Sequence, residues 1–141
     1  MPLSTIDRDM RQDVAEVLVR YATSIDRKDW VRFRTCFTED CQADYGDIGV
    51  WDGIDAITDY MTRVHPDAIR SLHRLTNVEV TREGDGVAAR SYVDVIYVGA
   101  ETGSGVHSAG TYDDELVRTG DGWKIARRRY TTVHMEPIGR G

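Results

Sequence analysis

The chain has 141 residues and a formal net charge of −6, from 18 Lys plus Arg against 24 Asp plus Glu. At about 150 residues per domain, this length predicts a single domain over residues 1–141 with its own hydrophobic core. Hydrophobic residues make up 40% and charged residues 30% of the chain, which is typical of globular proteins and excludes a mainly disordered one. Because a negative net charge repels phosphates and anionic lipids, neither nucleic acid nor a membrane is expected as a partner.

The N-terminal segment, MPLSTIDRDMRQDV, has neither the basic start nor the continuous apolar run of a secretory signal. No later stretch approaches the ~18 consecutive apolar residues that a membrane-spanning helix needs. The sequence therefore predicts a cytoplasmic protein. In that compartment Cys36 and Cys41 are expected as free thiols rather than as a disulfide.

A long amphipathic helix is expected near the N-terminus. Apolar residues recur at three- and four-residue spacing through residues 6–25, which is the pattern of a helix with one buried face. Ser4 precedes this run, and Asp7 lies three residues after Ser4. The pair is an acidic variant of the capping box, with Ser4 as the cap.

Shorter elements are expected in the middle of the chain. Residues 29–37 predict a second, short helix from their apolar spacing, and residues 53–64 predict a third helix that Pro66 stops. Between these two helices, residues 41–45 have the length of a short strand.

Beyond residue 70 the pattern changes to long strands. β-branched residues become frequent and alternate with polar ones, and glycine-rich turns separate the segments. Four strands in series are therefore expected, at residues 71–82, 87–98, 106–119 and 123–134. Helices followed by an antiparallel meander predict an α+β fold. A strongly curved sheet wrapped over the long helix would close a cone with an interior pocket.

Several common catalytic signatures are absent from the sequence. It contains no glycine-rich phosphate loop, no cysteine pair at zinc spacing, no His-Glu-x-x-His and no Gly-x-Ser-x-Gly motif. Acid–base chemistry and ligand binding therefore remain as possible functions. The histidines are far apart in sequence, which argues against a metal site. They are His65, His73, His107 and His134.

Two polar residues fall where burial would give them a chemical role. Asp26 ends the long predicted helix just outside its apolar face, so spacing alone favours a solvated helix-end aspartate over a catalytic one. His73 lies early in the first predicted strand, on the same face as Leu75. It is therefore either a buried structural histidine or a base in the pocket.

Asp94 and Arg128 raise the same question in the later strands. Asp94 shares a strand face with largely apolar side chains at positions 92, 96 and 98, which would bury its carboxylate unless the opposite face is the inner one. Arg128 shares a face with Tyr130 and lies opposite Arg127 and Arg129. Only one face of each strand can be inside, and the pattern leaves open which one it is.

Five short motifs stand in order along the chain: IDRKDW at 25–30, DY at 44–45, His73, HSA at 107–109 and DGWK at 121–124. This order and spacing resemble the SnoaL-like branch of the nuclear transport factor 2 superfold, in particular scytalone dehydratase. The order of Asp26, His73 and Arg128 is similar to that in hexachlorocyclohexane dehydrochlorinase. The set that resembles bile-acid dehydratase is Tyr21, Asp26, His73 and Asp94.

The resemblance implies a cone-shaped α+β barrel, with N-terminal helices packed in a strongly curved, mixed and mostly antiparallel sheet. In such a fold Asp26 would orient His73 as the base of an interior pocket. Arg128, Tyr21 or Tyr45 would stabilise an oxyanion or a leaving group.

The resemblance also assigns roles to residues of the later strands. Asp94 would serve as a second acid if burial keeps its carboxyl group protonated. The residues expected to contact substrate are Tyr45, Tyr92, Ser108 and Gly110.

These residues predict a lyase that uses neither a cofactor nor a metal. It would eliminate water from a hydrophobic cyclic, polyketide-like or steroid-like small molecule by means of a His–Asp general base. One alternative is an isomerase or a polyketide cyclase in the same pocket, and the cyclase would depend on Asp94 rather than on His73. Another is a non-catalytic ligand carrier or assembly subunit, like the small subunit of ring-hydroxylating dioxygenases, which needs no contact between Asp26 and His73. A homo-oligomer, either a trimer or a dimer, is expected because a curved sheet leaves its outer face apolar.

Overall fold

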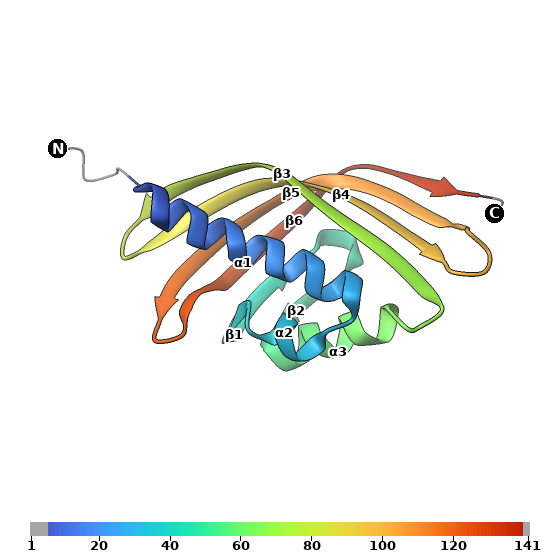
Figure 1. Ribbon diagram of the computed structural model, residues 1–141, viewed down its shortest axis with the longest axis horizontal. Helices are drawn as coiled ribbons and strands as arrows, with labels where there is room; N and C mark the ends of the chain where they lie inside the picture. The colour runs from blue at the N-terminus through green and yellow to red at the C-terminus, as the bar shows by residue number, and fades with distance from the viewer. Residues whose placement is uncertain (1–5, 140–141) are drawn as a thin grey trace.

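The computed structural model describes residues 6–139 and contains three α-helices and six strands in that range (Figure 1). No helix of this part of the chain is long and apolar enough to cross a membrane. The helices are α1 (Arg8–Arg27), α2 (Trp30–Arg34) and α3 (Ile54–Val64), with a single 3-10 turn, η1 (Gly46–Ile48). The strands are β1 (Phe37–Asp44), β2 (Val50–Asp52), β3 (Ile69–Glu83), β4 (Gly86–Gly99), β5 (Gly105–Thr119) and β6 (Gly122–Ile138).

The predicted elements are confirmed, with differences at their ends. α2 stops at Arg34 instead of residue 37, because Phe37 pairs with Ile125 of β6 and so begins β1. β1 is accordingly longer than the strand predicted at residues 41–45. β2 was not predicted, since three residues are too few to show an alternating pattern.

α1 is the long amphipathic helix that the apolar spacing predicts. Its cap is Asp7, whose side chain accepts a 2.7 Å hydrogen bond from the backbone N–H of Met10. The expected capping box was therefore wrong about Asp7, and Ser4 lies outside the described residues. At the other end, Lys28 adopts a left-handed conformation, and its ammonium donates to the carbonyl of Ile69 at 2.6 Å. This bond joins the end of α1 to the start of β3.

The six strands form one sheet in the order β2-β1-β6-β5-β4-β3. β3 to β6 pair antiparallel in series, as the predicted meander requires. β1 runs antiparallel to β2 and parallel to β6, so the sheet is mixed and mostly antiparallel. The expected α+β fold, with helices followed by a curved sheet, is confirmed.

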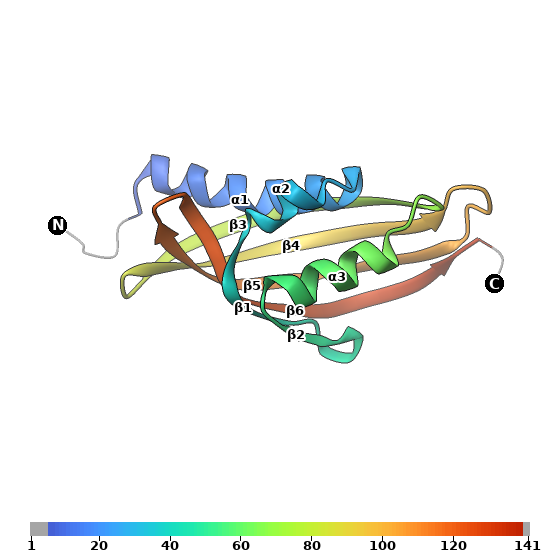
Figure 2. The same ribbon diagram turned by 90° about the horizontal axis from the view of Figure 1, so that it is seen from below.

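The sheet curves over the helices, which lie on its concave side (Figures 1 and 2). α1 packs along β3, and α3 packs against β1. Near the start of α1 the concave side is filled by an apolar core, whose members include Val14, Leu18, Val80, Val87, Leu116 and Ile125. Hydrogen-bonded polar side chains gather instead near the end of α1, where the candidate site lies.

The two cysteines are buried and not bonded to each other, as predicted. Burial raises the pKa of Cys36 and that of Cys41 to about 11. A thiol with such a pKa carries almost no thiolate near pH 7, so neither cysteine is a nucleophile.

Candidate active site

A pocket of about 300 Å³ opens between the end of α1, α3 and the inner faces of β3 to β6. Its wall is mostly apolar and aromatic, and none of the described residues that line it is Asp, Glu, Lys or Arg. Polar atoms reach it from two histidine rings, a serine and several tyrosine hydroxyls, which belong to His65, His73, Ser108, Tyr21, Tyr45, Tyr60, Tyr97, Tyr112 and Tyr130. Such a lining suits a small, uncharged and largely apolar ring compound.

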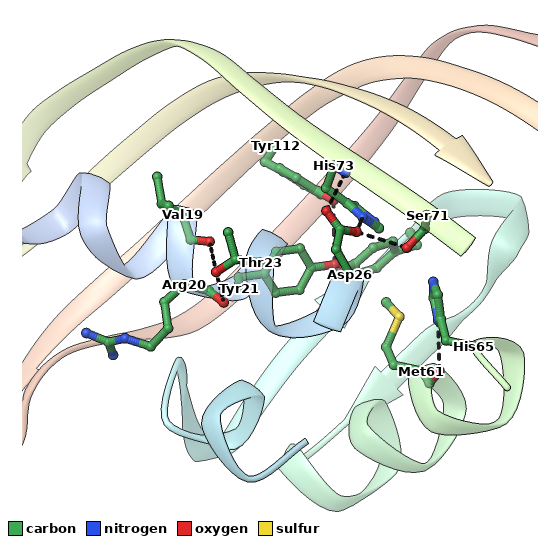
Figure 3. A network of polar contacts seen from close by, with 11 residues as sticks. Val19, Arg20, Tyr21, Thr23, Asp26, Met61, His65, Ser71, His73 and Tyr112 are labelled. Carbon is green, nitrogen blue, oxygen red and sulfur yellow. Dashed lines mark hydrogen bonds and ion pairs between the residues drawn. The ribbon is translucent and has the colours of Figure 1, made fainter. Parts of the chain in front are cut away.

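Asp26 and His73 form a largely buried pair at one side of this pocket (Figure 3). The Nδ1 of His73 lies 2.7 Å from Oδ1 of Asp26, and the backbone N–H of His73 donates to Oδ2 at 2.8 Å. Ser71 donates its hydroxyl to Oδ1 at 2.9 Å. Because a carboxylate only accepts, Nδ1 of His73 carries the hydrogen, and its Nε2 is left with a lone pair. The arrangement is that of a general base oriented by a carboxylate.

The local fold explains why these three residues meet. Asp26 lies in the last turn of α1, which packs along β3. Ser71 and His73 are two positions apart on β3, so their side chains leave the same face of the strand, toward the helix. Spacing alone favoured a solvated aspartate at the end of the helix. This expectation is wrong, because 84% of the Asp26 side chain is covered.

Three tyrosine hydroxyls form a chain beside the base. The hydroxyl of Tyr112 donates to that of Tyr21 at 3.5 Å, and the hydroxyls of Tyr21 and Tyr45 are 2.6 Å apart. Because Tyr21 already accepts from Tyr112, it can donate its own proton to Tyr45. The hydroxyl proton of Tyr45 is then free to donate to a ligand oxygen in the pocket.

Arg128 is buried beneath these tyrosines. It donates through Nε and Nη2 to the two carboxylate oxygens of Asp114 at 2.7 and 2.9 Å, and both side chains are fully covered. The guanidinium carbon lies 4.2 Å from the ring centre of Tyr21 and 3.7 Å from that of Tyr112. Burial raises the pKa of Tyr45 well above its usual value, and the charge of Arg128 partly offsets this. Arg128 does not line the pocket. Its positive charge affects the pocket through the tyrosines that it contacts.

A β-bulge turns Arg128 toward the interior. Ile125 pairs with Leu116 whereas Arg127 pairs with the adjacent Glu115, so Ala126 is an extra residue in β6. The alternation of faces shifts at this point, and Ile125 and Arg128 are both buried. No glycine or proline marks the bulge in the sequence.

The SnoaL-like domain family matches residues 8–129 of the chain. The chain belongs to the SnoaL-like domain family. This confirms the resemblance drawn from the motifs. The uncharacterized protein Rv2910c of Mycobacterium tuberculosis is 32% identical to this SnoaL-like chain over 128 residues, which cover 89% of this chain and 87% of that protein.

Solved structures share the fold of this SnoaL-like chain. A Novosphingobium aromaticivorans protein provisionally described as an aromatic ring hydroxylase is 28% identical, with a TM-score of 0.83 over 94% of this chain and 96% of that one. Another protein of this organism, provisionally described as a scytalone dehydratase, is 20% identical, with a TM-score of 0.81 over 89% of this chain and 85% of that one. The expected nuclear transport factor 2-like fold is therefore confirmed.

Asp94 and Tyr92, which were expected in the site, lie on the outer face of the sheet. Asp94 pairs there with Arg74 and His107, and these two partners lower the pKa of its carboxyl group. The expectation that burial keeps Asp94 protonated is therefore wrong. Tyr92 is half exposed beside Val133 on the same face. The inner face of β4 is the one that carries Val93, which is the alternative that the sequence pattern left open.

Ser108 lines the pocket as expected, whereas Gly110 does not. The hydroxyl of Ser108 lies 2.6 Å from that of Tyr130, with which it shares a hydrogen bond. A Cβ on Gly110 would lie 2.9 Å from Cε1 of Tyr130 and 2.1 Å from the backbone oxygen of Thr131. Gly110 therefore makes room for the backbone of β6 and the ring of Tyr130 rather than for a substrate.

The four histidines divide between the two faces of the sheet. His65 and His73 line the pocket, and His107 and His134 lie on the outer face with Glu136. Within residues 6–139, no group of three or more His, Cys, Asp or Glu side chains is placed to hold a metal ion.

His65 is one of several pocket residues that were not predicted from the sequence; the others include Tyr97, Tyr112 and Tyr130. His65 follows the last residue of α3, and its side chain is folded back toward Met61 one turn earlier. Its signal in the sequence is its position four residues after Met61 on the apolar face of the helix, just before Pro66. From the sequence, His65 was considered only as a possible metal ligand.

Proposed function

We propose that this SnoaL-like protein is a lyase that eliminates water from a small, neutral, cyclic β-hydroxy carbonyl compound without a cofactor. The observation that supports the proposal most directly is the buried contact between Asp26 and Nδ1 of His73, beside an uncharged pocket. A ligand carrier has no need of such a pair, whereas proton abstraction next to a carbonyl does.

His73 acts as the base through its Nε2. It takes a proton from the carbon next to the substrate carbonyl, and the electron pair of that C–H bond moves to form an enolate. Asp26 keeps the hydrogen on Nδ1 and stabilises the imidazolium that forms, because its carboxylate is 2.7 Å away. Ser71 and the backbone of His73 hold the carboxylate in place during this step.

The enolate oxygen is stabilised by the tyrosine chain. Tyr45 donates its hydroxyl proton to the developing negative charge, and Tyr21 donates in turn to Tyr45. The buried cation of Arg128, over the ring of Tyr21, favours negative charge at this end of the pocket.

Collapse of the enolate expels the hydroxyl group at the β-carbon. The imidazolium of His73 gives its proton to this leaving group, so that water departs and the base is restored. The product is an α,β-unsaturated carbonyl compound, and no oxidant or reductant is consumed.

The known proteins give this proposal coarse support. Proteins of this fold include one provisionally described as a scytalone dehydratase, which is consistent with catalysis on small molecules. An isomerase would use the same base and return the proton to another carbon, so product analysis separates it from a lyase. A cyclase that depends on Asp94 is disfavoured, since that residue is outside the pocket.

The proposal is tested with a panel of 3-hydroxycyclohexanones and their aryl derivatives, by following the absorbance of the conjugated enone. Wild-type protein is expected to release water and the enone. His73→Ala is expected to lower turnover by roughly 10²- to 10⁴-fold, the usual contribution of a general base. Asp94→Asn is the matched control on the outer face and is expected to keep wild-type turnover. Unchanged turnover in a folded His73→Ala protein would overturn the mechanism.

A further inference from the structure

His65 places a second imidazole in the pocket, next to the proposed base (Figure 3). The two ring centres are 6.2 Å apart. The Nδ1 of His65 lies 2.8 Å from the backbone oxygen of Met61. A carbonyl oxygen only accepts, so Nδ1 must carry the hydrogen, and the neutral ring has its lone pair on Nε2.

The free nitrogen of His65 faces away from its own helix. Nδ1 is turned back toward α3, so the opposite edge of the ring, with Nε2, is directed at the pocket that His65 lines. Among residues 6–139, none donates a hydrogen bond to this nitrogen. The ring is held in place by aromatic neighbours, with Trp30 at 6.1 Å and Tyr97 at 5.5 Å between ring centres. The pocket therefore contains a fixed acceptor without a donor.

His65 is kept neutral by its surroundings. Only 7% of the residue is exposed, and this burial lowers the pKa of its imidazole. The hydrogen bond to Met61 offsets part of this decrease, and the neighbouring His73 adds to it. Of the other charged groups nearby, Asp26 favours the proton and Lys28 opposes it. When His73 takes up a proton as the base, its charge opposes protonation of His65 further. His65 thus remains an acceptor throughout the reaction.

We propose that His65 is a specificity-determining residue, whose Nε2 accepts a hydrogen bond from a hydroxyl group of the substrate. A buried acceptor left unpaired lowers the affinity for any ligand that covers it without supplying a donor. The pocket therefore selects neutral ring compounds that carry a hydroxyl group over otherwise identical compounds that lack one.

This selection fits the elimination, and in that respect the inference rests on the proposed function. A β-hydroxy carbonyl compound presents an acidic C–H and a hydroxyl group on neighbouring carbons. With the ring centres of His65 and His73 6.2 Å apart, one small ring reaches both, with its C–H at His73 and its hydroxyl at His65. Binding itself can be measured without any turnover.

The test uses 2-naphthol and naphthalene, two neutral probes that differ only in the hydroxyl group. Their dissociation constants are measured by fluorescence titration with wild-type protein, His65→Phe and His65→Gln. Wild type is expected to prefer 2-naphthol about tenfold, the value of one hydrogen bond to a buried acceptor. His65→Phe is expected to abolish the preference, and naphthalene should bind at least as tightly as to wild type because it no longer covers an unpaired acceptor. His65→Gln keeps an acceptor oxygen and is expected to retain part of the preference.

A measurement on the unaltered chain does not depend on any variant folding. In ¹⁵N NMR spectra of wild-type protein, Nε2 of His65 is expected to show the shift of an unprotonated nitrogen. This shift should move when 2-naphthol is added and stay in place with naphthalene. The inference would be overturned if folded His65→Phe still preferred 2-naphthol over naphthalene. It would also be overturned if the ¹⁵N shift of Nε2 of His65 did not change when 2-naphthol is added.

The same experiment separates this inference from the proposed function. His73→Phe is expected to keep the preference for 2-naphthol, because the donor binds at His65. If the preference disappears in His73→Phe and survives in His65→Phe, the acceptor is His73. The inference then fails, but the role of His73 as the base in the proposed function is not affected. If the preference depends on His65 but no β-hydroxy ketone is turned over, only the proposed reaction is refuted.

Discussion

The carboxylate of Asp26 holds both the ring and the backbone of His73, although 47 residues separate the two in sequence. Oδ1 receives the Nδ1 hydrogen at 2.7 Å, and Oδ2 receives the backbone N–H at 2.8 Å. One side chain therefore sets the tautomer of the imidazole and the position of the strand that carries it. Changes to Asp26 should affect catalysis through that tautomer.

Asp26→Asn is expected to lower turnover by roughly 10²- to 10⁴-fold. The amide keeps the shape of the carboxylate, but its NH₂ group can donate a hydrogen bond to Nδ1 of His73. Nδ1 then acts as an acceptor, and the ring hydrogen lies on Nε2. Turnover and the ¹⁵N shifts of the His73 ring are measured on the same samples. Ser71→Ala, which removes a single hydrogen bond to Asp26, is the milder control. Wild-type rates with a changed tautomer would show that the base is elsewhere.

Tyr45→Phe is expected to lower kcat by roughly 10²- to 10³-fold with little change in KM. The hydroxyl group is lost where negative charge develops in the transition state, while the ring that contacts the substrate remains. Tyr130→Phe is the matched control, because its hydroxyl is engaged by Ser108. Equal effects of the two substitutions would mean that Tyr45 has no special part in stabilising the enolate.

Arg128→Met is expected to destabilise the fold by about 3–5 kcal/mol. Asp114 would remain fully buried without its cation, and burial already raises the pKa of this carboxyl group. Urea unfolding measures the loss. The double substitution Arg128→Met with Asp114→Leu removes both charges and should recover much of the stability. If the single and double variants are equally unstable, packing against the tyrosine rings outweighs the charge pair.

The pH dependence of stability should reveal His107 on the outer face. The carboxylates of Asp94 and Glu136 raise the pKa of this imidazole above its usual 6.5, with Asp94 as the larger cause. Because the folded state binds the proton more tightly, the contribution is complete below pH 6.5 and is lost as the pH rises through the raised pKa. The pKa values of Asp94 and Glu136 are lowered, so their contribution persists above pH 4.5 and is lost in acid as the pH falls through the lowered values.

Thermal unfolding of wild-type protein and His107→Gln between pH 5 and pH 9 checks this prediction. The difference in Tm between the two should be largest near pH 5 to 6.5 and should shrink at higher pH. Arg74, which also pairs with Asp94, and His134, beside Glu136, are present in both proteins. A difference in Tm that does not vary with pH would contradict the assigned contacts.

The expected homo-oligomer stays a prediction, with the outer face of the sheet as its contact surface. An apolar outer face was expected, but this face is only partly apolar. It exposes Tyr92 and Val133, and it also carries a row of alternating charges across five strands. The row consists of Glu79, Arg90, Asp113, Arg129 and Asp44. Opposite charges meet when a second copy of this row is turned end to end and displaced by one strand, so that Arg90 of one copy faces Asp113 of the other.

Sedimentation at micromolar concentration should therefore show a dimer or a trimer. Tyr92→Glu and Val133→Glu would place like charges in the contact and should shift the protein toward the monomer. Val31→Glu, an exposed residue of α2 away from the sheet, is the matched control. A wild-type protein that sediments as a monomer would rule out this use of the outer face.

Local sequence patterns are enough to predict the helices and the long strands and their order along the chain. The three- and four-residue spacing on α1 and the alternation in β3 to β6 are local patterns that burial imposes on every helix and strand with one inner face. The motifs then identified the family, and through it the pairing of Asp26 with His73. Spacing alone would have left Asp26 in solvent, because nothing local records that β3 passes beside the end of α1.

Which face of each strand is buried depends on contacts that form only in the folded protein. In a strand, a shift of one residue reverses every side chain, so the bulge at Ala126 brings Arg128 under the tyrosines without any mark in the sequence. Asp94 points outward because the opposite face of β4, with Val93, closes the core. His65 enters the pocket because the chain just after α3 brings its ring beside those of His73 on β3 and Tyr97 on β4. Each of these placements depends on contacts between distant segments, which periodicity along one segment does not encode.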